Sequence, residues 1–280
     1  MKTVQDPTGI VMLDGVLSAA TDPTLHAGLP GVLRGEGIFE TFLCRDGQPS
    51  ALLPKHDARL VHSAGLTGFD IAPGELHQRF EEFRGQVSEG NWRVRLTVLR
   101  GLEDQQHFLW TAGPEPAAKE SVVLMISDFR LDPQDPIAGA KTISRIGLQV
   151  ARRQAQFVGA FDAIQRTIDG DLAEGTSANL FLWMEDGLHT PGLNRGILGG
   201  VTREAVLEAC LRAKIPVFER NIALEELSRA VEVYITNAVI GVTPVASILD
   251  WRDSLPGPQG KALHRIQAAY CDYLAAVTEA

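Results

Sequence analysis

The sequence contains little cysteine and no clustered histidine. Its 280 residues include three cysteines, an odd number without CxxC spacing, and seven histidines without HxH or HxxxH spacing. These counts argue against a disulfide framework and favour a reducing compartment, so we expect a cytoplasmic protein. Because paired cysteine or histidine ligands are missing, we expect no metal site.

Long apolar runs and an excess of positive charge are also missing. No uninterrupted apolar stretch approaches membrane-spanning length, and residues 1–7 lack the apolar run of a secretory signal. The net charge is −9 and the pI is near 5.3, which argues against nucleic acid or an anionic membrane surface as a partner. A local basic pocket for an anionic small molecule is compatible with this balance.

The common nucleotide-binding and hydrolase motifs are absent as well. The Gly-x-Gly at residues 35–37 leads into a β-rich run, and Glu40 stands where a dinucleotide fingerprint has its third glycine. There is no Walker A sequence, and the segment 175–179 lacks the closing glycine of a G-x-S-x-G nucleophile elbow. These absences leave dinucleotide and nucleoside triphosphate binding without support and a serine hydrolase only weakly supported.

Hydrophobic periodicity predicts a mixture of helices and strands. We expect helices over 54–66, 74–88 and 147–158, one that opens in the segment 196–203 and runs through 213, one from 224 onward, and one over 258–278. Four Asp-Gly pairs, at 14–15, 46–47, 169–170 and 186–187, predict hairpin turns between short strands. These hairpins favour an α+β fold with antiparallel sheets over a doubly wound parallel sheet. The Pro-rich segment 113–119 is the best linker candidate, so we expect two domains, 1–118 and 119–280.

Lysine is scarce, and one lysine occupies an unusual place. Of the six lysines, Lys141 heads the β-like and mostly uncharged segment 140–147. An amine in a poorly solvated place has a lowered pKa and can act as a nucleophile or form a Schiff base. A solvated lysine at a strand end is the alternative interpretation, and this segment alone favours it.

Two further segments are compatible with an anionic ligand. Gly199 and Gly200 precede an expected helix at Val201 and Thr202, and a helix N-terminus with glycines can hold a phosphate. Glu174 lies among small residues before an apolar strand, where a carboxylate needs a cationic partner. An ordinary loop–helix junction and a carboxylate paired with arginine are the competing interpretations.

The order of the motifs is more informative than any one of them. Together they resemble the class IV (fold type IV) pyridoxal-phosphate enzymes, a family that includes branched-chain and D-amino acid aminotransferases and 4-amino-4-deoxychorismate lyase. The resemblance covers residues from about 10 to about 250 and rests on these motifs: Phe39-Glu40-Thr41, His56-x-x-Arg59-Leu60, Lys141 before a helix, Glu174-Gly175-x-x-x-Asn179-Leu180-Phe181, Ile197-Leu198-Gly199-Gly200-Val201-Thr202-Arg203 and Thr243-Pro244-Val245.

The resemblance implies a two-domain α+β fold of the D-amino acid aminotransferase type, a homodimer, and pyridoxal 5′-phosphate as cofactor. It implies that Lys141 forms the Schiff base with the cofactor and moves protons, and that Glu174 contacts the pyridine nitrogen. The phosphate would be held by Arg59 and by the backbone N–H groups of Val201 and Thr202. Further contacts to the cofactor are expected from these two neighbouring positions: Asn237 and Ala238.

The substrate side of the resemblance favours a lyase. Phe39 and Thr41 match substrate-site positions, and an Asn-Ala pair at 237–238 is similar to the lyases. In the loop 100–107 only His107 fits the Arg-x-His carboxylate trap of the D-amino acid aminotransferases. We therefore expect a 4-amino-4-deoxychorismate lyase that releases pyruvate and 4-aminobenzoate. A class IV transaminase acting on an amine or amino acid is the alternative, and a cofactor-free anion-binding protein is a distant one.

Overall fold

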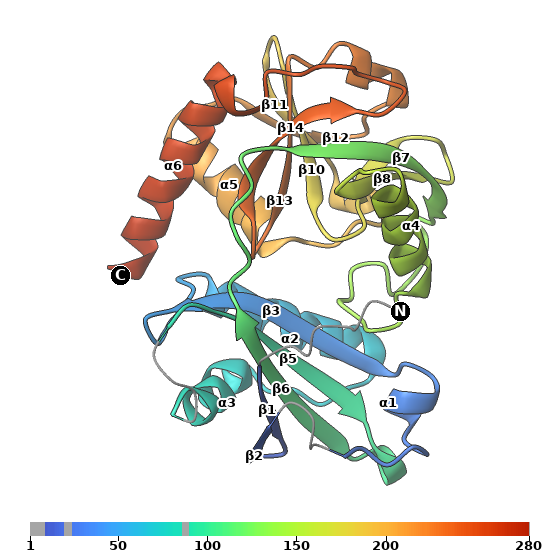
Figure 1. The fold of residues 1–280 in the computed structure, drawn as a ribbon, viewed down its shortest axis with the longest axis vertical. Coiled ribbons are helices and arrows are strands. Elements are labelled where there is room, and N and C mark those ends of the chain that lie inside the picture. Colours follow the sequence, from blue (N-terminus) through green and yellow to red (C-terminus); the bar gives the residue numbers. More distant parts are fainter. Residues whose placement is uncertain (1–8, 20–23, 86–89, 280) are drawn as a thin grey trace. The chain divides into compact units, whose positions relative to one another are not determined.

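The computed structural model describes residues 9–19, 24–85 and 90–279, which divide into two units of mixed helix and strand (Figure 1). Unit 1 comprises the described residues of Met1–Ala117 together with Ala140–Ser144, and unit 2 comprises Ala118–Gly139 and the described residues from Arg145 onward. The prediction about a secretory signal at residues 1–7 lies outside the described residues.

Unit 1 contains a six-stranded antiparallel sheet in the order β2-β1-β6-β5-β3-β4. Its elements are β1 (Ile10–Leu13), β2 (Val16–Ala19), α1 (Pro30–Leu33), β3 (Gly37–Arg45), β4 (Gln48–Pro49), α2 (Leu53–Thr67), α3 (Glu75–Arg84), β5 (Trp92–Arg100) and β6 (Gln106–Pro114). The Asp-Gly pairs at 14–15 and 46–47 adopt positive φ angles and join antiparallel strands, which confirms both predicted hairpins.

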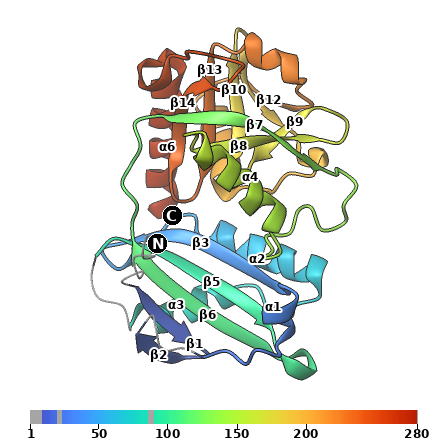
Figure 2. The same cartoon turned by 45° about the vertical axis from the view of Figure 1, so that its right-hand side comes forward.

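The helices α2 and α3 cover one face of this sheet, as Figures 1 and 2 show. An aromatic cluster fills the layer between them: Phe83 stacks on Trp110 with ring centroids 5.0 Å apart, and Phe42 meets Phe80 edge-on at 5.3 Å. Because side chains alternate along a strand, β3 turns Phe42 toward this core and its neighbours toward the opposite face. This alternation decides which side chains of β3 are available to a ligand.

Unit 2 contains an eight-stranded sheet in the order β12-β11-β10-β13-β14-β7-β8-β9, and β9 also pairs with β10. Its elements are β7 (Val122–Leu131), α4 (Ile146–Phe157), β8 (Asp162–Thr167), β9 (Leu172–Gly175), β10 (Asn179–Met184), β11 (Gly187–Pro191), α5 (Val201–Arg212), β12 (Val217–Arg220), β13 (Glu232–Asn237), β14 (Gly241–Ile248) and α6 (Lys261–Thr278). Small residues of α4, Ala151 and Ala155, let it pack closely on β7 and β8.

Three expectations need correction. The sheet of unit 2 is mixed, because β11–β12, β14–β7 and β7–β8 pair in parallel. The helix expected from residue 224 is only a 3₁₀ segment, Leu224–Ser228, and the chain enters β13 at Glu232. The β-like segment 140–147 forms a single bridge, between Thr142 and Ile38.

The segment that carries Lys141 belongs to unit 1. The expected boundary after residue 118 puts Lys141 in the C-terminal domain, whereas residues 140–144 pack with unit 1. The backbone N–H of Ile143 donates to the carbonyl of Gly37, and the carbonyl of Lys141 accepts from Phe39. A Cβ on Gly37 would lie 2.8 Å from the Val98 carbonyl oxygen as well as from the Ile143 side chain, so this close approach requires glycine. No helix among the described residues is long and apolar enough to cross a membrane.

Candidate active site

Lys141 is half-buried and is held from both sides within unit 1. Its backbone N–H donates to Ser63 Oγ at 3.0 Å, and its carbonyl accepts from the Phe39 N–H at 3.0 Å. The Nζ atom lies 4.6 Å from the centroid of the Phe39 ring. Ser63 is one helical turn beyond Arg59 on α2, so the lysine backbone is anchored on the helix face that also carries Arg59. Three predicted site residues, Phe39, Arg59 and Lys141, therefore belong to one region of unit 1.

Arg59 is held in a buried charged cluster with Glu40 and His56. Glu40 has no exposed surface, and its two oxygens accept from Arg59 Nε at 2.8 Å and Nη2 at 2.7 Å. Burial would raise the pKa of Glu40, but the charges and hydrogen bonds of Arg59 and His56 outweigh it and lower the pKa to about 2. The resulting carboxylate fixes the orientation of the Arg59 guanidinium.

His56 completes this cluster. Burial lowers its pKa, although Glu40 opposes the shift. Its Nδ1 lies 2.7 Å from Glu40 Oε2, so Nδ1 carries the proton that it donates to the carboxylate. The buried Nε2 has no hydrogen-bond partner among the described residues.

The opposite face of the unit 1 sheet carries Phe39, Thr41 and a residue that the sequence analysis missed, Arg95. In the strand register Thr41 faces Arg95, and Arg95 faces Thr111. The Arg95 guanidinium lies 3.7 Å from the Phe39 ring centroid, and its Nε donates to Thr97 Oγ1 at 3.0 Å. Both Arg95 and Lys141 thus place a cation near the Phe39 ring. In the sequence, the alternation of charged and apolar residues over 92–100 indicates a strand with one side facing solvent or a pocket, and this pattern could have pointed to Arg95.

His107, the predicted substrate residue of the loop 100–107, has a partner elsewhere in unit 1. Its Nδ1 lies 2.8 Å from Asp14 Oδ2, and the other Asp14 oxygen accepts from the backbone of Phe108 at 2.8 Å. This pairing ties the start of β6 to the β1–β2 turn. The substrate role of His107 stays a prediction.

Glu174 is the penultimate residue of β9 in unit 2, where uncharged donors bind its carboxylate and an arginine lies nearby. Asn179 Nδ2 donates to Glu174 Oε2 at 3.0 Å, and the Leu198 N–H donates to Oε1 at 3.2 Å. Arg145 is near enough for its charge to interact with the carboxylate. Burial lowers the pKa of Arg145, and the negative charges of Glu174 and Asp162 oppose the shift.

The turn that follows Glu174 is organised by the buried carboxylate of Asp162. Its oxygens accept from the backbone N–H and hydroxyl groups of both Thr176 and Ser177. A Cβ on Gly175 would lie 3.0 Å from Asp162 Oδ2, which leaves little room there for another residue. The Arg145 guanidinium donates to the carbonyl of Thr176. This arrangement fixes both the turn and the arginine beside Glu174.

The N-terminus of α5 provides a place for an anion. Gly200 is the N-cap and no side chain caps the helix, so the first N–H groups are not bonded to a capping side chain. The Thr202 hydroxyl is buried and has no hydrogen-bond partner among the described residues. A buried hydroxyl without a partner is unfavourable, and a phosphate at this helix end would satisfy it.

Asn237 has a structural role that the sequence analysis did not anticipate. Its Oδ1 accepts from the N–H groups of Val239 and Ile240, and its Nδ2 donates to the Ser177 carbonyl at 3.0 Å. These bonds fix the β13–β14 turn in which Ala238 lies, and they join this turn to the one after Glu174. Asn237 therefore positions the turn, and its contact with a cofactor stays a prediction, as does that of Ala238.

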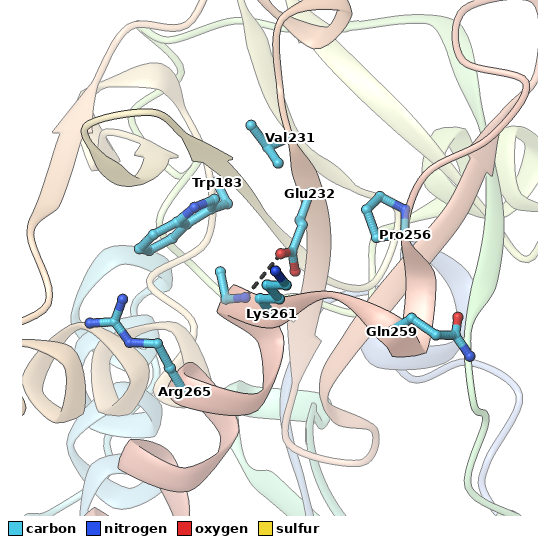
Figure 3. Close-up of a pocket in the computed structure, with 8 residues that line it drawn as sticks. Trp183, Val231, Glu232, Pro256, Gln259, Lys261 and Arg265 are labelled. Carbon is cyan, nitrogen blue, oxygen red and sulfur yellow. Dashed lines mark hydrogen bonds between the residues drawn. The ribbon is translucent and has the colours of Figure 1, made fainter.

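A separate cavity of about 440 Å³ lies in unit 2 (Figure 3). It is lined by Trp183, Val231, Glu232, Pro256, Gln259, Lys261, Ala262 and Arg265. None of these is a predicted site residue. The Glu232 carboxylate is occupied by Tyr234 and by the backbone N–H groups of Ala262 and Leu263, which fastens the start of α6.

Comparison with known proteins defines the family. The sequence model of the family described as amino-transferase class IV matches residues 37–248, so the chain belongs to this family. A protein of Thermotoga maritima named probable branched-chain-amino-acid aminotransferase is 32% identical over 79% of this chain and 81% of its own length. The aminodeoxychorismate lyase of Bacillus subtilis is 27% identical over 85% of this chain and 86% of its own. The fold matches that of a hypothetical aminotransferase from Mycobacterium tuberculosis in its PLP-bound form, with a TM-score of 0.83, 24% identity, and coverage of 96% of this chain and 99% of that one.

The chain is therefore a pyridoxal-phosphate enzyme with an α+β fold of type IV, as expected from the sequence. Its residues fit the cofactor chemically. Lys141 offers an amine, Glu174 a carboxylate for a protonated ring nitrogen, and the start of α5 an uncapped helix end with an unsatisfied hydroxyl. When bound, pyridoxal phosphate supplies an electron sink for the carbon that bears the substrate amine. Membership of this family sets aside the cofactor-free binding protein.

Proposed function

We propose that the chain is a 4-amino-4-deoxychorismate lyase, which forms 4-aminobenzoate and pyruvate. The observation that carries this proposal is the polar face beside Phe39, where Arg95 lies between Thr41 and Thr111 in the strand register. The lyase substrate carries two carboxylates, and a guanidinium with neighbouring hydroxyls binds such groups. A substrate with an aliphatic side chain would instead bury the guanidinium and the hydroxyls without hydrogen-bond partners, which is unfavourable.

In this proposal each side chain has a separate task. The Lys141 amine holds the cofactor and, once displaced by the substrate amine, removes the proton from the carbon that bears it. Glu174 keeps the ring nitrogen of the cofactor protonated. Arg59, the backbone N–H groups of Val201 and Thr202, and the Thr202 hydroxyl bind the phosphate. Arg95 binds a substrate carboxylate, and Thr41 orients the substrate beside it.

A class IV transaminase is the second candidate, and the name of the Thermotoga maritima relative favours it. Both reactions begin when Lys141 removes the same proton, so these residues serve either outcome. The two candidates differ in the later steps. In the lyase reaction pyruvate leaves the ring of the substrate, whereas in the transaminase reaction the amino group is passed to a keto acid.

A side-by-side assay tests the proposal. Pyruvate and 4-aminobenzoate release is measured with aminodeoxychorismate, and keto acid formation is measured with D-alanine, L-leucine and (R)-1-phenylethylamine. We expect turnover in the first reaction, and Lys141→Ala should abolish it together with the visible absorbance of the bound cofactor. If only the amino acids and the amine are turned over, the lyase proposal is wrong and the chain is a transaminase.

Arg95 gives the assay a matched pair of variants. We expect Arg95→Met to lower kcat/KM for aminodeoxychorismate about 100-fold, the cost of leaving a carboxylate without its charged partner. Arg95→Lys keeps the charge and should retain more of the activity. Equal activity of Arg95→Met and wild type would remove Arg95 from the substrate site.

Two further expectations stay predictions. We infer a homodimer, because the family resemblance implies one, and light scattering measures it directly. The cytoplasmic location rests on composition alone, and cell fractionation tests it.

A further inference from the structure

Asn179 occupies the place where the Glu174 carboxylate and the loop before α5 meet. It is 4% exposed and is the first residue of β10, where it pairs with Glu174 on one side and Thr236 on the other. Its Nδ2 donates to Glu174 Oε2 at 3.0 Å and to the Leu198 carbonyl at 2.9 Å. Both protons of one amide are thus used, one on each partner.

The loop completes this arrangement. The N–H of Leu198 returns a hydrogen bond to the other Glu174 oxygen at 3.2 Å. A Cβ built on Gly200, the N-cap of α5, would lie 1.9 Å from Asn179 Oδ1, so the amide lies directly against the loop backbone. Glu174, Asn179 and Leu198 are therefore joined by three hydrogen bonds within unit 2.

From this geometry we propose that Asn179 is a positioning residue, which fixes the Glu174 carboxylate relative to the phosphate-binding start of α5. The inference rests on the proposed roles of Glu174 and of this helix end. A ligand that contacts both groups requires a set distance between them. The Asn179 amide holds that distance because it donates two hydrogen bonds and cannot rotate without losing one of them.

The chemistry of the amide also restricts the charge on Glu174. A donor on Oε2 stabilises the carboxylate form and leaves it an acceptor. Aspartate at position 179 would keep the size of the side chain and remove both donors. An oxygen of the introduced aspartate would then face the oxygens of Glu174 and Leu198, and this repulsion disfavours the ionised form of Glu174.

A double-mutant cycle on the holoenzyme tests the proposal. Asn179→Asp, Glu174→Gln and the double variant are compared by cofactor dissociation constant and by the pH titration of the visible absorbance. We expect Asn179→Asp alone to weaken cofactor binding about 10- to 100-fold, the range for a lost hydrogen bond to a charged group, and to shift the titration. In the Glu174→Gln background the new amide can donate to the introduced aspartate, so the same substitution should have a much smaller effect.

Controls separate positioning from folding. Asn221→Asp makes the same chemical change at an exposed residue of unit 2 and should leave both readouts unchanged. Asn179→Ser serves in the cycle if the aspartate variant does not fold, and circular dichroism of the cofactor-free proteins checks this. Equal losses in both backgrounds, or an unshifted titration, would overturn the proposal. These readouts do not require lyase turnover, so failure of the lyase assay leaves the positioning test intact.

Discussion

Two buried carboxylates, Glu40 of unit 1 and Asp162 of unit 2, are held in different ways. In unit 1 Glu40 is bonded by charged or titratable side chains of α2, Arg59 and His56. In unit 2 Asp162 is bonded by backbone N–H groups and hydroxyls of one turn. A cluster of the first kind depends on charge, because removal of one ion leaves the other unpaired in the interior. A cluster of the second kind depends on backbone shape, because its donors are neutral and fixed by the turn.

The largest expected effect is in the charged cluster. Arg59→Ala leaves the fully buried Glu40 without its bidentate partner and should destabilise the cofactor-free protein by about 3–5 kcal/mol, as for other broken buried ion pairs. Urea denaturation measures the loss, and hydrogen exchange of α2 peptides localises it to unit 1. Arg59→Lys keeps the charge but not the paired N–H donors of the guanidinium, so it should lose less stability than Arg59→Ala. Equal stability of Arg59→Ala and wild type would show that Glu40 does not depend on the arginine.

Acid should weaken the same cluster by a slightly smaller amount. The pKa of Glu40 is lowered from 4.5 to about 2, so its contribution is complete above about pH 4.5 and is lost as the pH falls toward 2. The lost contribution is about 3 kcal/mol, since a tenfold change in an equilibrium corresponds to about 1.4 kcal/mol. Glu40→Gln cannot titrate, so its stability should fall less steeply between pH 5 and 3, as measured by urea denaturation at each pH. Parallel curves for the two proteins would contradict the ion pair.

The contact between Gly200 and Asn179 in unit 2 should respond to added volume. A Cβ on Gly200 would lie 1.9 Å from Asn179 Oδ1, and we expect Gly200→Ala to destabilise the cofactor-free protein by about 1–3 kcal/mol, as for other overpacked sites. Gly199→Ala adds the same methyl group where nothing lies within 4 Å, so its stability should be nearly unchanged. Thermal unfolding compares the two variants. A similar loss in both would attribute the effect to the helix start in general.

The same contrast explains what the sequence could predict. The Asp-Gly turns and the amphipathic helices α2 and α6 are predictable, because each depends on residues close in sequence. The shortness of the 3₁₀ segment Leu224–Ser228 is not, because the chain turns into β13 only four residues later and that strand is fixed by its partners across the sheet. The parallel strands are also missed, since no local signal reports which strands pair across the sheet.

Within the site, residue type was more predictable than residue contact. A scarce lysine and a glycine-flanked helix start are visible in the sequence, and the order of the motifs gives Lys141 and Thr202 their predicted roles. Arg95 needs the register of β3 and β5 to bring it onto Phe39, and Asn179 needs the loop before α5, about twenty residues away, to give it a role. Motifs therefore identify the chemical groups, and the fold determines which of them act together.

Thr202 gives the smallest expected effect on stability and separates cofactor binding from folding at the start of α5. Its buried hydroxyl has no partner among the described residues, so Thr202→Val removes an unsatisfied polar atom at nearly constant volume. The cofactor-free variant should be as stable as wild type within about 0.5 kcal/mol, or slightly more stable. Cofactor affinity, measured by equilibrium dialysis, should nevertheless fall about tenfold, because the phosphate loses one donor. Thr202→Ser keeps the hydroxyl and should retain the affinity. If Thr202→Val binds the cofactor as tightly as wild type, the hydroxyl does not contact the phosphate, and the helix N–H groups alone hold it.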